Sequence, residues 1–213
     1  MLKILKFFYN TTASRFHILG IFSLAIVIFS IGVGIGWKAP FFGSVSIPRT
    51  NGIVFDESQA IEGFALIDDN GESFGIERLQ GTWSVIYFGY THCPDICPTA
   101  LSVLAKFSAL RSQESDVPLQ YIFVSIDPER DTLPLLRAYT EFFFSDLIGV
   151  TGSIEELTDF ASQLSVSFEN SSSAGEDYSV SHSDVVVLTN PRGFLQAIFT
   201  PPHSADKLLL SLI

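Results

Sequence analysis

Two apolar runs on either side of a helical segment limit the possible folds of this chain more than any other feature. The runs WSVIYFGY (residues 83–90) and QYIFVSID (residues 120–127) have strand length and are rich in β-branched and aromatic residues. Such runs are typical of strands buried on both faces, as in parallel sheets. Between them, residues 98–113 carry apolar side chains at helical spacing. The order therefore predicts two parallel strands joined by a crossover helix.

The segments that follow continue the alternation and add an antiparallel edge. Helical spacing and cap signals predict three more helices, over residues 132–144, 153–164 and 204–212. Two strands joined by a turn at Pro191 and Gly193 precede the last of these helices. This is the order of an α/β domain with a central mixed sheet flanked by helices. Because a cysteine pair stands at the start of the first helix, the order fits a thioredoxin-like fold.

Three short patterns predict local structure. Asn70-Gly71 after an apolar stretch predicts a tight hairpin, because this pair tolerates the positive φ that such turns require. Ser153 and Glu156 have the spacing of a capping box, in which each side chain binds the other residue's backbone N–H. The small and polar residues 170–177 predict a mobile loop.

The N-terminal part of the chain contains a long uncharged stretch. Residues 18–37, ILGIFSLAIVIFSIGVGIGW, have the length of about twenty residues that a helix needs to cross the hydrocarbon core. A cleaved signal peptide has a shorter apolar region, so the stretch predicts one transmembrane anchor. Positive charge is slightly more frequent before the stretch, at Lys3, Lys6 and Arg15, than after it. This excess predicts a short cytoplasmic N-terminus over residues 1–17.

The composition after the anchor predicts the remaining boundaries. Residues 38–59 mix Pro, Gly and Ser without periodicity, which predicts a tether, and the domain is expected to cover residues 60–213. This organisation predicts a single-pass inner-membrane protein whose domain faces the periplasm, or the mitochondrial intermembrane space in a eukaryote. The lack of a long Arg- and Ser-rich leader before the apolar stretch favours the bacterial compartment.

The charge balance limits the possible partners. Five of the 12 Lys and Arg residues lie in the first 50 positions, whereas all 23 Asp and Glu residues lie at Asp56 or later. The part after position 50 therefore has a formal charge of −16. This balance argues against nucleic acid as a partner, because phosphate contacts need a basic face. It leaves open whether the acidic surface only keeps the domain soluble or meets a cationic partner.

Cys93 and Cys97 are the two cysteines of the chain, and they lie at the predicted start of the first helix. If the helix begins near Cys93, a spacing of four places both sulfurs on one face. The partial positive charge of a helix N-terminus favours thiolate over thiol and lowers the cysteine pKa. A thiolate is both the nucleophile of thiol chemistry and a metal ligand, so the pattern serves either use.

The cysteine pair has three possible uses. A structural disulfide would close so small a loop that it would stabilise the fold only weakly. A redox dithiol more often has two intervening residues, as in Cys-X-X-Cys. A soft-metal site with one histidine would have three protein ligands, which suits Cu(I), whereas structural zinc almost always has four. The residues favour copper and leave a thiol-disulfide oxidoreductase, a thiol peroxidase or a redox sensor open.

Four histidines are candidates for the third ligand. His17 is excluded by its place at the membrane edge. His92 is next to Cys93, and neighbouring side chains in an extended chain point to opposite sides, so it is expected to support the loop. His203, beside two prolines, is expected in a surface turn. His182 precedes the strand DVVVLT, in a loop that a thioredoxin-like sheet would bring beside the cysteines, but a loop histidine bonded to backbone has the same pattern.

Three sequence blocks carry a resemblance to a known family. They read GTWSVIYFGYTHCPDICPTAL (residues 81–101), VSIDPERDT (residues 124–132) and SHSDVVVLTNPRGF (residues 181–194). Together they resemble the Sco/SenC family of membrane-anchored, thioredoxin-like copper proteins. The resemblance implies that copper is bound by three side chains that match the family's CPxxCP segment and distant histidine, namely Cys93, Cys97 and His182.

The resemblance also implies a function. Members of the family help to assemble the binuclear copper centre of cytochrome c oxidase, either as copper donors to subunit II or as thiol reductants of its cysteines. The chain is therefore expected to be a copper metallochaperone that holds Cu(I) or Cu(II), with subunit II or a related copper-receiving protein as its partner. Enzymatic thiol-disulfide reduction stays open as the alternative.

The chain departs from the family pattern at two places. Ser181 stands where the family usually has Asp before the ligand histidine, and Asn190-Pro191 replaces the usual Asp-Pro pair. A carboxylate that orients the imidazole of His182 must then come from elsewhere, and Asp184 is the candidate. These departures leave the ligand set intact, and a paralogue with a different client stays open.

Overall fold

The computed structural model describes residues 51–114, 117–169 and 178–211. The predicted N-terminus, the anchor, most of the tether and the loop at residues 170–177 lie outside these ranges. In the part that is described, no helix combines the length and the apolar character needed to cross a bilayer.

A mixed sheet forms the centre of the domain, with the strand order β1-β10-β9-β4-β5-β6-β2-β3 in the described residues. Strands β4 (Trp83–Gly89) and β5 (Leu119–Ser125) run parallel, as the two apolar runs predict, and β6 (Leu147–Thr151), which was not predicted from the sequence, continues the parallel order. Antiparallel strands extend the sheet on both sides: β1 (Gly52–Ala60), β2 (Leu66–Asp68), β3 (Ser73–Phe74), β9 (Val186–Thr189) and β10 (Phe194–Phe199).

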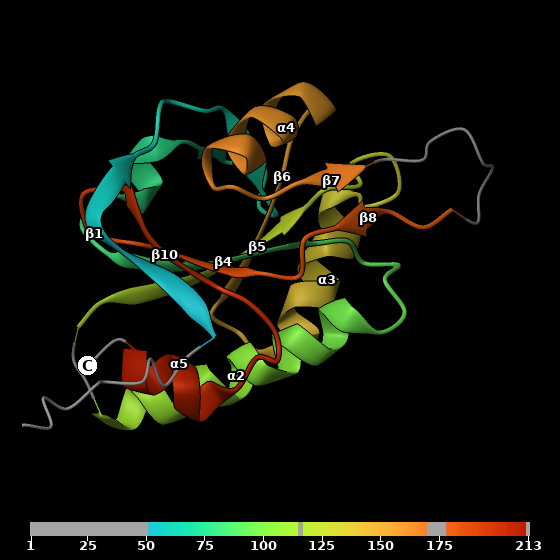
Figure 1. Ribbon diagram of the computed structural model, residues 1–213. Helices are drawn as coiled ribbons and strands as arrows, with labels where there is room; N and C mark the ends of the chain where they lie inside the picture. Colours follow the sequence, from blue (N-terminus) through green and yellow to red (C-terminus); the bar gives the residue numbers. More distant parts are fainter. Residues whose placement is uncertain (1–50, 115–116, 170–177, 212–213) are drawn as a thin grey trace, which may run out of the picture. The chain divides into compact units, whose positions relative to one another are not determined.

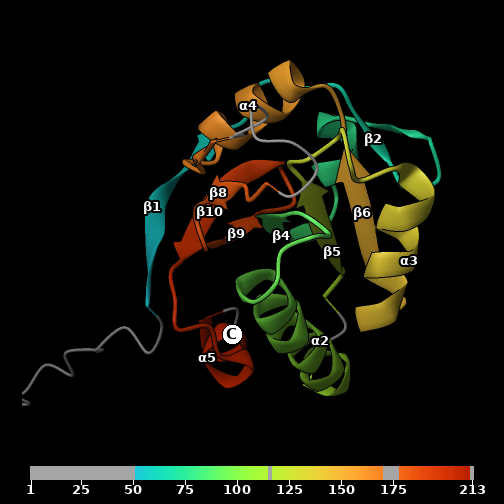
Figure 2. The ribbon, with the colours of Figure 1, turned by 90° about the vertical axis from the view of Figure 1, so that its right-hand side faces the viewer.

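Helices cover both faces of the sheet (Figures 1 and 2). One face carries α2 (Ile96–Glu114), α3 (Leu133–Phe143) and α5 (Ala205–Ser211), and the other carries α4 (Ile154–Gln163). Helices α2 and α3 share a face because both connect parallel strands in the same direction, and such crossovers are right-handed. A short 3-10 helix, η1 (Ile76–Leu79), follows β3. The predicted α/β order with a mixed sheet and flanking helices is confirmed.

The hydrophobic core lies between the central strands and the helices. Residues 84–90 are all buried, and so are residues 121–127, which explains why both runs are apolar without alternation. Large aromatic side chains fill much of this space, including Phe88 against Phe160 of α4 and Phe107 of α2 against Tyr121. The strand ends are therefore held in fixed positions, which matters for the side chains that follow them.

The predicted end of the tether is wrong for residues 52–59. These residues belong to β1, which pairs with β10 from Gly52 opposite Phe199 to Ala60 opposite Phe194. The strand escaped prediction because an edge strand is held by backbone hydrogen bonds, which need no alternation of apolar side chains. Most of its side chains are exposed. The domain thus begins at least eight residues earlier than the composition indicates.

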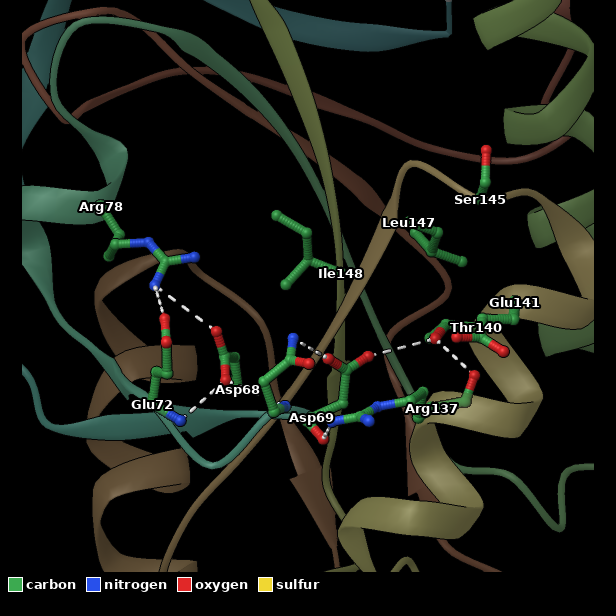
Figure 3. A pocket seen from close by; sticks show the side chains of 11 residues that line it. Asp68, Asp69, Glu72, Arg78, Arg137, Thr140, Glu141, Ser145, Leu147 and Ile148 are labelled. Atoms are coloured by element: carbon green, nitrogen blue, oxygen red, sulfur yellow. Dashed lines mark hydrogen bonds and ion pairs between the residues drawn. The ribbon is translucent and has the colours of Figure 1, made fainter.

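The predicted hairpin joins β2 to β3, and Gly71 has the positive φ of +82° that its turn requires. Buried carboxylates hold this hairpin against β6 and α3, beside a cleft of about 350 Å³ (Figure 3). Asp69 accepts hydrogen bonds from the Gly149 N–H (3.0 Å) and from Thr140 (3.3 Å). Asp68 accepts bonds from two backbone N–H groups of the turn and pairs with Arg78 (3.4 Å). Because the carboxylates already have partners, we assign the cleft a structural role.

The N-cap of α4 agrees only in part with the predicted capping box. Ser153 accepts a hydrogen bond from the Glu156 N–H, at 3.3 Å, as predicted. The Glu156 carboxylate does not bond back to Ser153 but accepts the N–H of Ala65, at 3.1 Å. Glu156 therefore ties α4 to the segment before β2, a long-range contact that sequence spacing does not reveal.

Candidate metal centre

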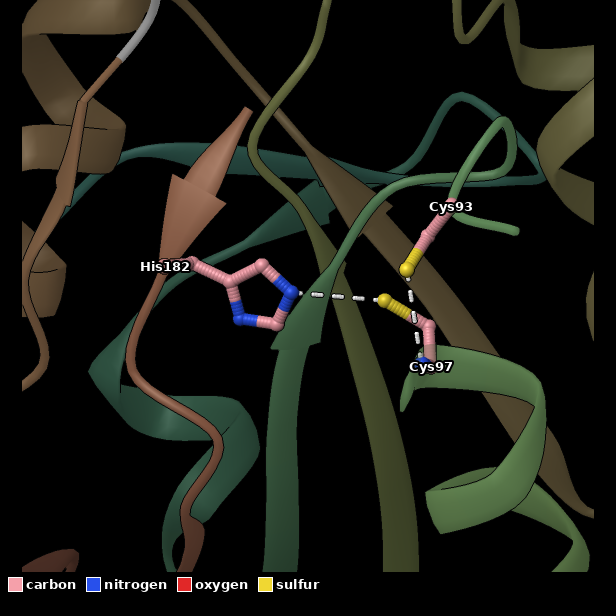
Figure 4. A group of neighbouring side chains, drawn as sticks. All are labelled: Cys93, Cys97 and His182. Carbon is pink, nitrogen blue, oxygen red and sulfur yellow. Dashed lines mark hydrogen bonds between the residues drawn. The ribbon is translucent and has the colours of Figure 1, made fainter. Parts of the chain in front are cut away.

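Side chains from three separate segments meet at one edge of the sheet (Figure 4). Cys93 lies in the loop after β4, Cys97 in the first turn of α2, and His182 on β8 (Ser181–His182). The two sulfurs and one imidazole nitrogen lie within 4.8 Å of one another. No other group of three metal-ligating side chains comes as close in the ranges that the structure describes.

The topology of the sheet explains why these segments meet. Strand β9 is antiparallel to β4, with Val186 opposite Tyr87 near the end of β4. The chain that leaves β4 toward the cysteines therefore lies beside the chain that enters β9 from His182. A short ribbon of β7 (Phe168–Glu169) and β8, separate from the main sheet, carries the histidine. Residues 85 positions apart, Cys97 and His182, are brought into contact in this way.

Both cysteines are free thiols and both are buried. The helix begins at Ile96, so Cys97 lies in its first turn, and Cys93 precedes it by three residues. Cys93 still faces Cys97, because the Cys97 N–H points at the Cys93 sulfur, at 3.5 Å. Cys97 is fully buried, whereas Cys93 keeps 8% of its surface exposed. The outer sulfur is therefore the one that a partner molecule reaches first.

Gly89 at the end of β4 makes room for the inner sulfur. A Cβ at this position would lie 2.8 Å from the Cys97 sulfur and 2.9 Å from the Phe123 ring. Neither neighbour is the free end of a flexible side chain, so a larger residue would push the sulfur out of place. Glycine here is a requirement of the site rather than of the backbone conformation, because Gly89 is not among the described glycines with positive φ.

The His182 ring is oriented by a backbone carbonyl and two aromatic side chains. Since a carbonyl only accepts, Nδ1–H donates to the Ser183 oxygen (3.1 Å), which leaves the Nε2 lone pair facing the Cys97 sulfur at 3.4 Å. Tyr87 and Tyr90 contact the ring edge-on, each with a centroid distance of 6.2 Å. The expectation that the Asp184 carboxylate orients this imidazole directly is wrong, because that carboxylate bonds to Tyr87 and His203.

Burial sets the protonation of His182 and Cys97 in the metal-free protein. It lowers the pKa of His182, despite the opposing Ser183 carbonyl, so the imidazole is neutral at neutral pH and can bind a metal. It also raises the pKa of the Cys97 thiol, and the neighbouring Cys93 side chain adds to the rise. The prediction that the helix N-terminus lowers the pKa fails for Cys97, because desolvation is the larger effect. Cys97 therefore keeps its proton until a cation displaces it.

Of the roles predicted for the other histidines, that of His92 is confirmed and that of His203 is wrong. His92 is half exposed and contacts Thr91 (3.0 Å) and Asp131 (3.5 Å) away from the sulfurs, so it supports the loop as predicted. His203 is not a surface residue. Only 6% of its side chain is exposed, because the chain after β10 folds back against β4, and its Nε2–H donates to Asp184 at 3.0 Å. His17 lies outside the described residues.

The block VSIDPERDT shapes the loop that follows β4. Asp131 accepts hydrogen bonds from the Thr91 N–H (2.9 Å) and from Ser125 (2.6 Å). Asp127 pairs with Arg130 at 2.6 Å, and Arg130 stacks on the Tyr178 ring at 3.6 Å. Sequence reasoning missed the polar cluster of Tyr87, Asp184 and His203 behind the site. The signal available for it was a phenol inside an otherwise apolar strand.

Comparisons with known proteins agree with this geometry. The profile of the SCO1/SenC family matches residues 55–212. The chain belongs to the SCO1/SenC family. Its relatives include the mitochondrial protein SCO1 homolog 1 of Arabidopsis thaliana, 38% identical over 68% of this chain and 43% of that protein. The SCO2-like protein RP587 of Rickettsia prowazekii is 30% identical over 86% of this chain and 92% of that protein.

The solved structures of Sco proteins have the same fold. The crystal structure of Arabidopsis thaliana ScoI with copper bound matches with a TM-score of 0.66 and 37% identity, over 71% of this chain and 94% of that one. The likeness confirms the predicted thioredoxin-like fold. This chain spans less than half of the Arabidopsis SCO1 homolog 1, so the activity of that whole protein is not transferred by similarity alone.

Proposed function

We propose that this protein is a copper metallochaperone in which Cys93, Cys97 and His182 hold the ion and pass it to a copper-receiving protein. The observation that carries the proposal is the convergence of two sulfurs and one imidazole nitrogen within 4.8 Å. Copper is the cargo of this function, and the protein supplies its ligands.

The donor set fits copper better than other common metals. Two thiolates and a neutral imidazole are soft ligands, which select Cu(I) or Zn(II) over hard cations. In the described part of the chain, no fourth His, Cys, Asp or Glu belongs to the group. Three ligands suit Cu(I), whereas structural zinc almost always has four. The copper bound to Arabidopsis ScoI supports the same choice of ion.

The burial of the ligands gives a direction for transfer. Cys97 is fully buried, Cys93 keeps 8% of its surface exposed, and His182 is partly exposed. A ligand of the receiving protein can therefore replace Cys93 or His182 first, while the buried Cys97 still holds the ion. The receiving protein that the SCO1/SenC resemblance indicates is subunit II of cytochrome c oxidase, whose binuclear centre takes up copper. We further propose that residues 18–37 anchor the protein in a membrane, with the domain in the periplasm or intermembrane space.

Titration of the reduced chain with Cu(I) under anaerobic conditions tests the binding step. We expect one Cu(I) per chain in competition with a chromophoric Cu(I) chelator. Replacing Cys93 or Cys97 by Ala should lower the affinity by a factor of about 100 or more, which is about 2.7 kcal/mol. His182→Ala should lower it by a smaller factor, and His92→Ala, half exposed and outside the group, is the matched control.

Two results would contradict the proposal. One is a reduced wild-type chain that takes up no Cu(I), and the other is a His182→Ala variant that binds as tightly as the wild type. Rapid turnover of a disulfide or of peroxide without copper would support the oxidoreductase alternative instead. In cells, deletion of the gene should lower oxidase activity, and added copper should restore part of it if delivery is the function.

A further inference from the structure

Three polar side chains, two of them buried and one partly exposed, lie behind the metal ligands and do not belong to the ligand group. They are Tyr87 in β4, Asp184 in the connection between β8 and β9, and His203 after β10. The Tyr87 hydroxyl and the His203 Nε2–H both donate to the same Asp184 oxygen, at 3.1 and 3.0 Å. Tyr87 is fully buried, and 25% of the Asp184 side chain is exposed. One carboxylate thus joins three segments.

Asp184 follows the short ribbon that carries His182. The histidine stands on the β7–β8 ribbon, whose strands have two residues each and do not join the main sheet. Next to the histidine, the Ser183 N–H donates to the Ser167 carbonyl at 2.9 Å. This bond holds the ribbon together but does not attach it to the main sheet. Two residues after the histidine, Asp184 fastens the chain to the central strand through Tyr87. After His182 in the chain, the hydrogen bond between Asp184 and Tyr87 is therefore the first side-chain bond that attaches the ribbon to the main sheet.

Tyr87 extends this connection to the ligands. Its ring contacts the His182 ring edge-on (6.2 Å, 84°) and the His203 ring edge-on (6.5 Å, 87°). A tyrosine held at its hydroxyl cannot tilt without disturbing the imidazole beside it. Fixing the phenol therefore fixes one wall of the metal centre.

We propose that Asp184 is a positioning residue, which holds the His182 arm over the two sulfurs by binding Tyr87 and His203 at once. It is not a fourth ligand, because the described ligand group contains only the two cysteines and His182. The inference rests on the proposed function, since copper binding is its readout. An arm that is in place only part of the time lowers the apparent affinity in proportion to that fraction.

A double-mutant cycle on the purified, reduced full chain tests the inference, with Cu(I) affinity measured by chelator competition. Asp184→Ala should weaken Cu(I) binding by about tenfold, because the arm loses its connection to β4. In a His182→Ala background the same substitution should change the affinity by less than about twofold, since there is no imidazole left to position. Asp206→Ala, an exposed carboxylate paired with Lys106, is the control and should bind as the wild type does.

The cycle separates positioning from a general effect on the fold. Asp184→Ala with wild-type affinity would overturn the inference, and so would an equal loss in both backgrounds. If Asp184→Ala does not fold, Asp184→Asn decides, because it keeps the shape and one acceptor oxygen while it loses the charge; a loss of about threefold that vanishes without His182 is expected. A wild-type chain that binds no Cu(I) would instead refute the proposed function, and the inference with it.

Discussion

At the scale of single residues, the site depends on a glycine and on backbone groups as well as on the three side chains that face one another. Cys93, Cys97 and His182 are the proposed ligands, and Gly89 supplies the space in which the inner sulfur lies. A Ser183 carbonyl, rather than a carboxylate, selects the imidazole tautomer. The chemistry is therefore set by backbone groups and by packing as much as by the ligands.

Gly89→Ala should damage the site without touching a ligand. The added methyl group would stand 2.8 Å from the Cys97 sulfur, and overpacking of this kind costs about 1–3 kcal/mol of unfolding free energy. We expect a loss of stability in urea unfolding together with weaker Cu(I) binding. Gly63→Ala is the matched control, because nothing lies within 4 Å of its added methyl group. Equal behaviour of the two variants would show that the close approach at Gly89 has no consequence.

At the scale of elements, the ligands differ in how firmly they are held. Helix α2 has 19 residues and carries Cys97 in its first turn, whereas β8 has two residues and carries His182. The arm before β8 is fastened by Arg130, which pairs with Asp127 (2.6 Å) and donates to the Tyr178 carbonyl (2.9 Å). The cysteines are therefore fixed by the core, and the histidine is fixed by side-chain contacts.

Arg130→Ala should loosen the histidine arm and leave the cysteines in place. It removes the charged partner of the fully buried Asp127 carboxylate, to which the Tyr178 hydroxyl also donates, at a cost of about 1–3 kcal/mol. We expect lower stability in urea unfolding and weaker Cu(I) binding, with both sulfurs still reactive toward a thiol reagent after denaturation. Arg192→Ala, an exposed arginine that bonds to Ser58, should change the stability by about 0.5 kcal/mol or less. A stable Arg130→Ala variant would refute the role of this contact.

At the scale of the whole molecule, the metal would connect the stretch that carries both cysteines with His182, which lies 85 positions after Cys97. One ligand follows β4, one begins α2 and one precedes β9, so an ion bound to all three joins both sides of the sheet edge. The part of the chain after position 50 has a formal charge of −16, which argues against nucleic acid as a partner.

Cu(I) should therefore raise the thermal stability of the protein. Any ligand that binds the folded state alone stabilises it, by about 2.7 kcal/mol at a free concentration 100 times its Kd. We expect a higher Tm with one equivalent of Cu(I) than without it, measured anaerobically on the reduced chain. In the Cys93→Ser/Cys97→Ser double variant the ion should leave Tm unchanged. The same rise in that variant would mean that copper binds elsewhere.

Much of the fold was predictable from local patterns. The runs at residues 83–90 and 120–127 predict buried parallel strands because burial on both faces removes polar residues. The Asn70-Gly71 turn is confirmed for a similar reason, since its backbone conformation restricts the residue types. The strand β1 and the carboxylate of Glu156 were not predictable, because their partners, β10 and Ala65, lie far away in the sequence.

The sequence by itself determined which ligand types this protein has. It contains two cysteines at the start of a helix and four histidines, so a site built from them has soft sulfur and nitrogen donors. Only the tertiary structure decided that His182 faces the sulfurs while His203 is buried against Asp184. It also decided that Cys97 is a protonated thiol rather than a thiolate, because burial raises its pKa. Ligand types are properties of residues, whereas distances and desolvation arise when β9 is placed beside β4.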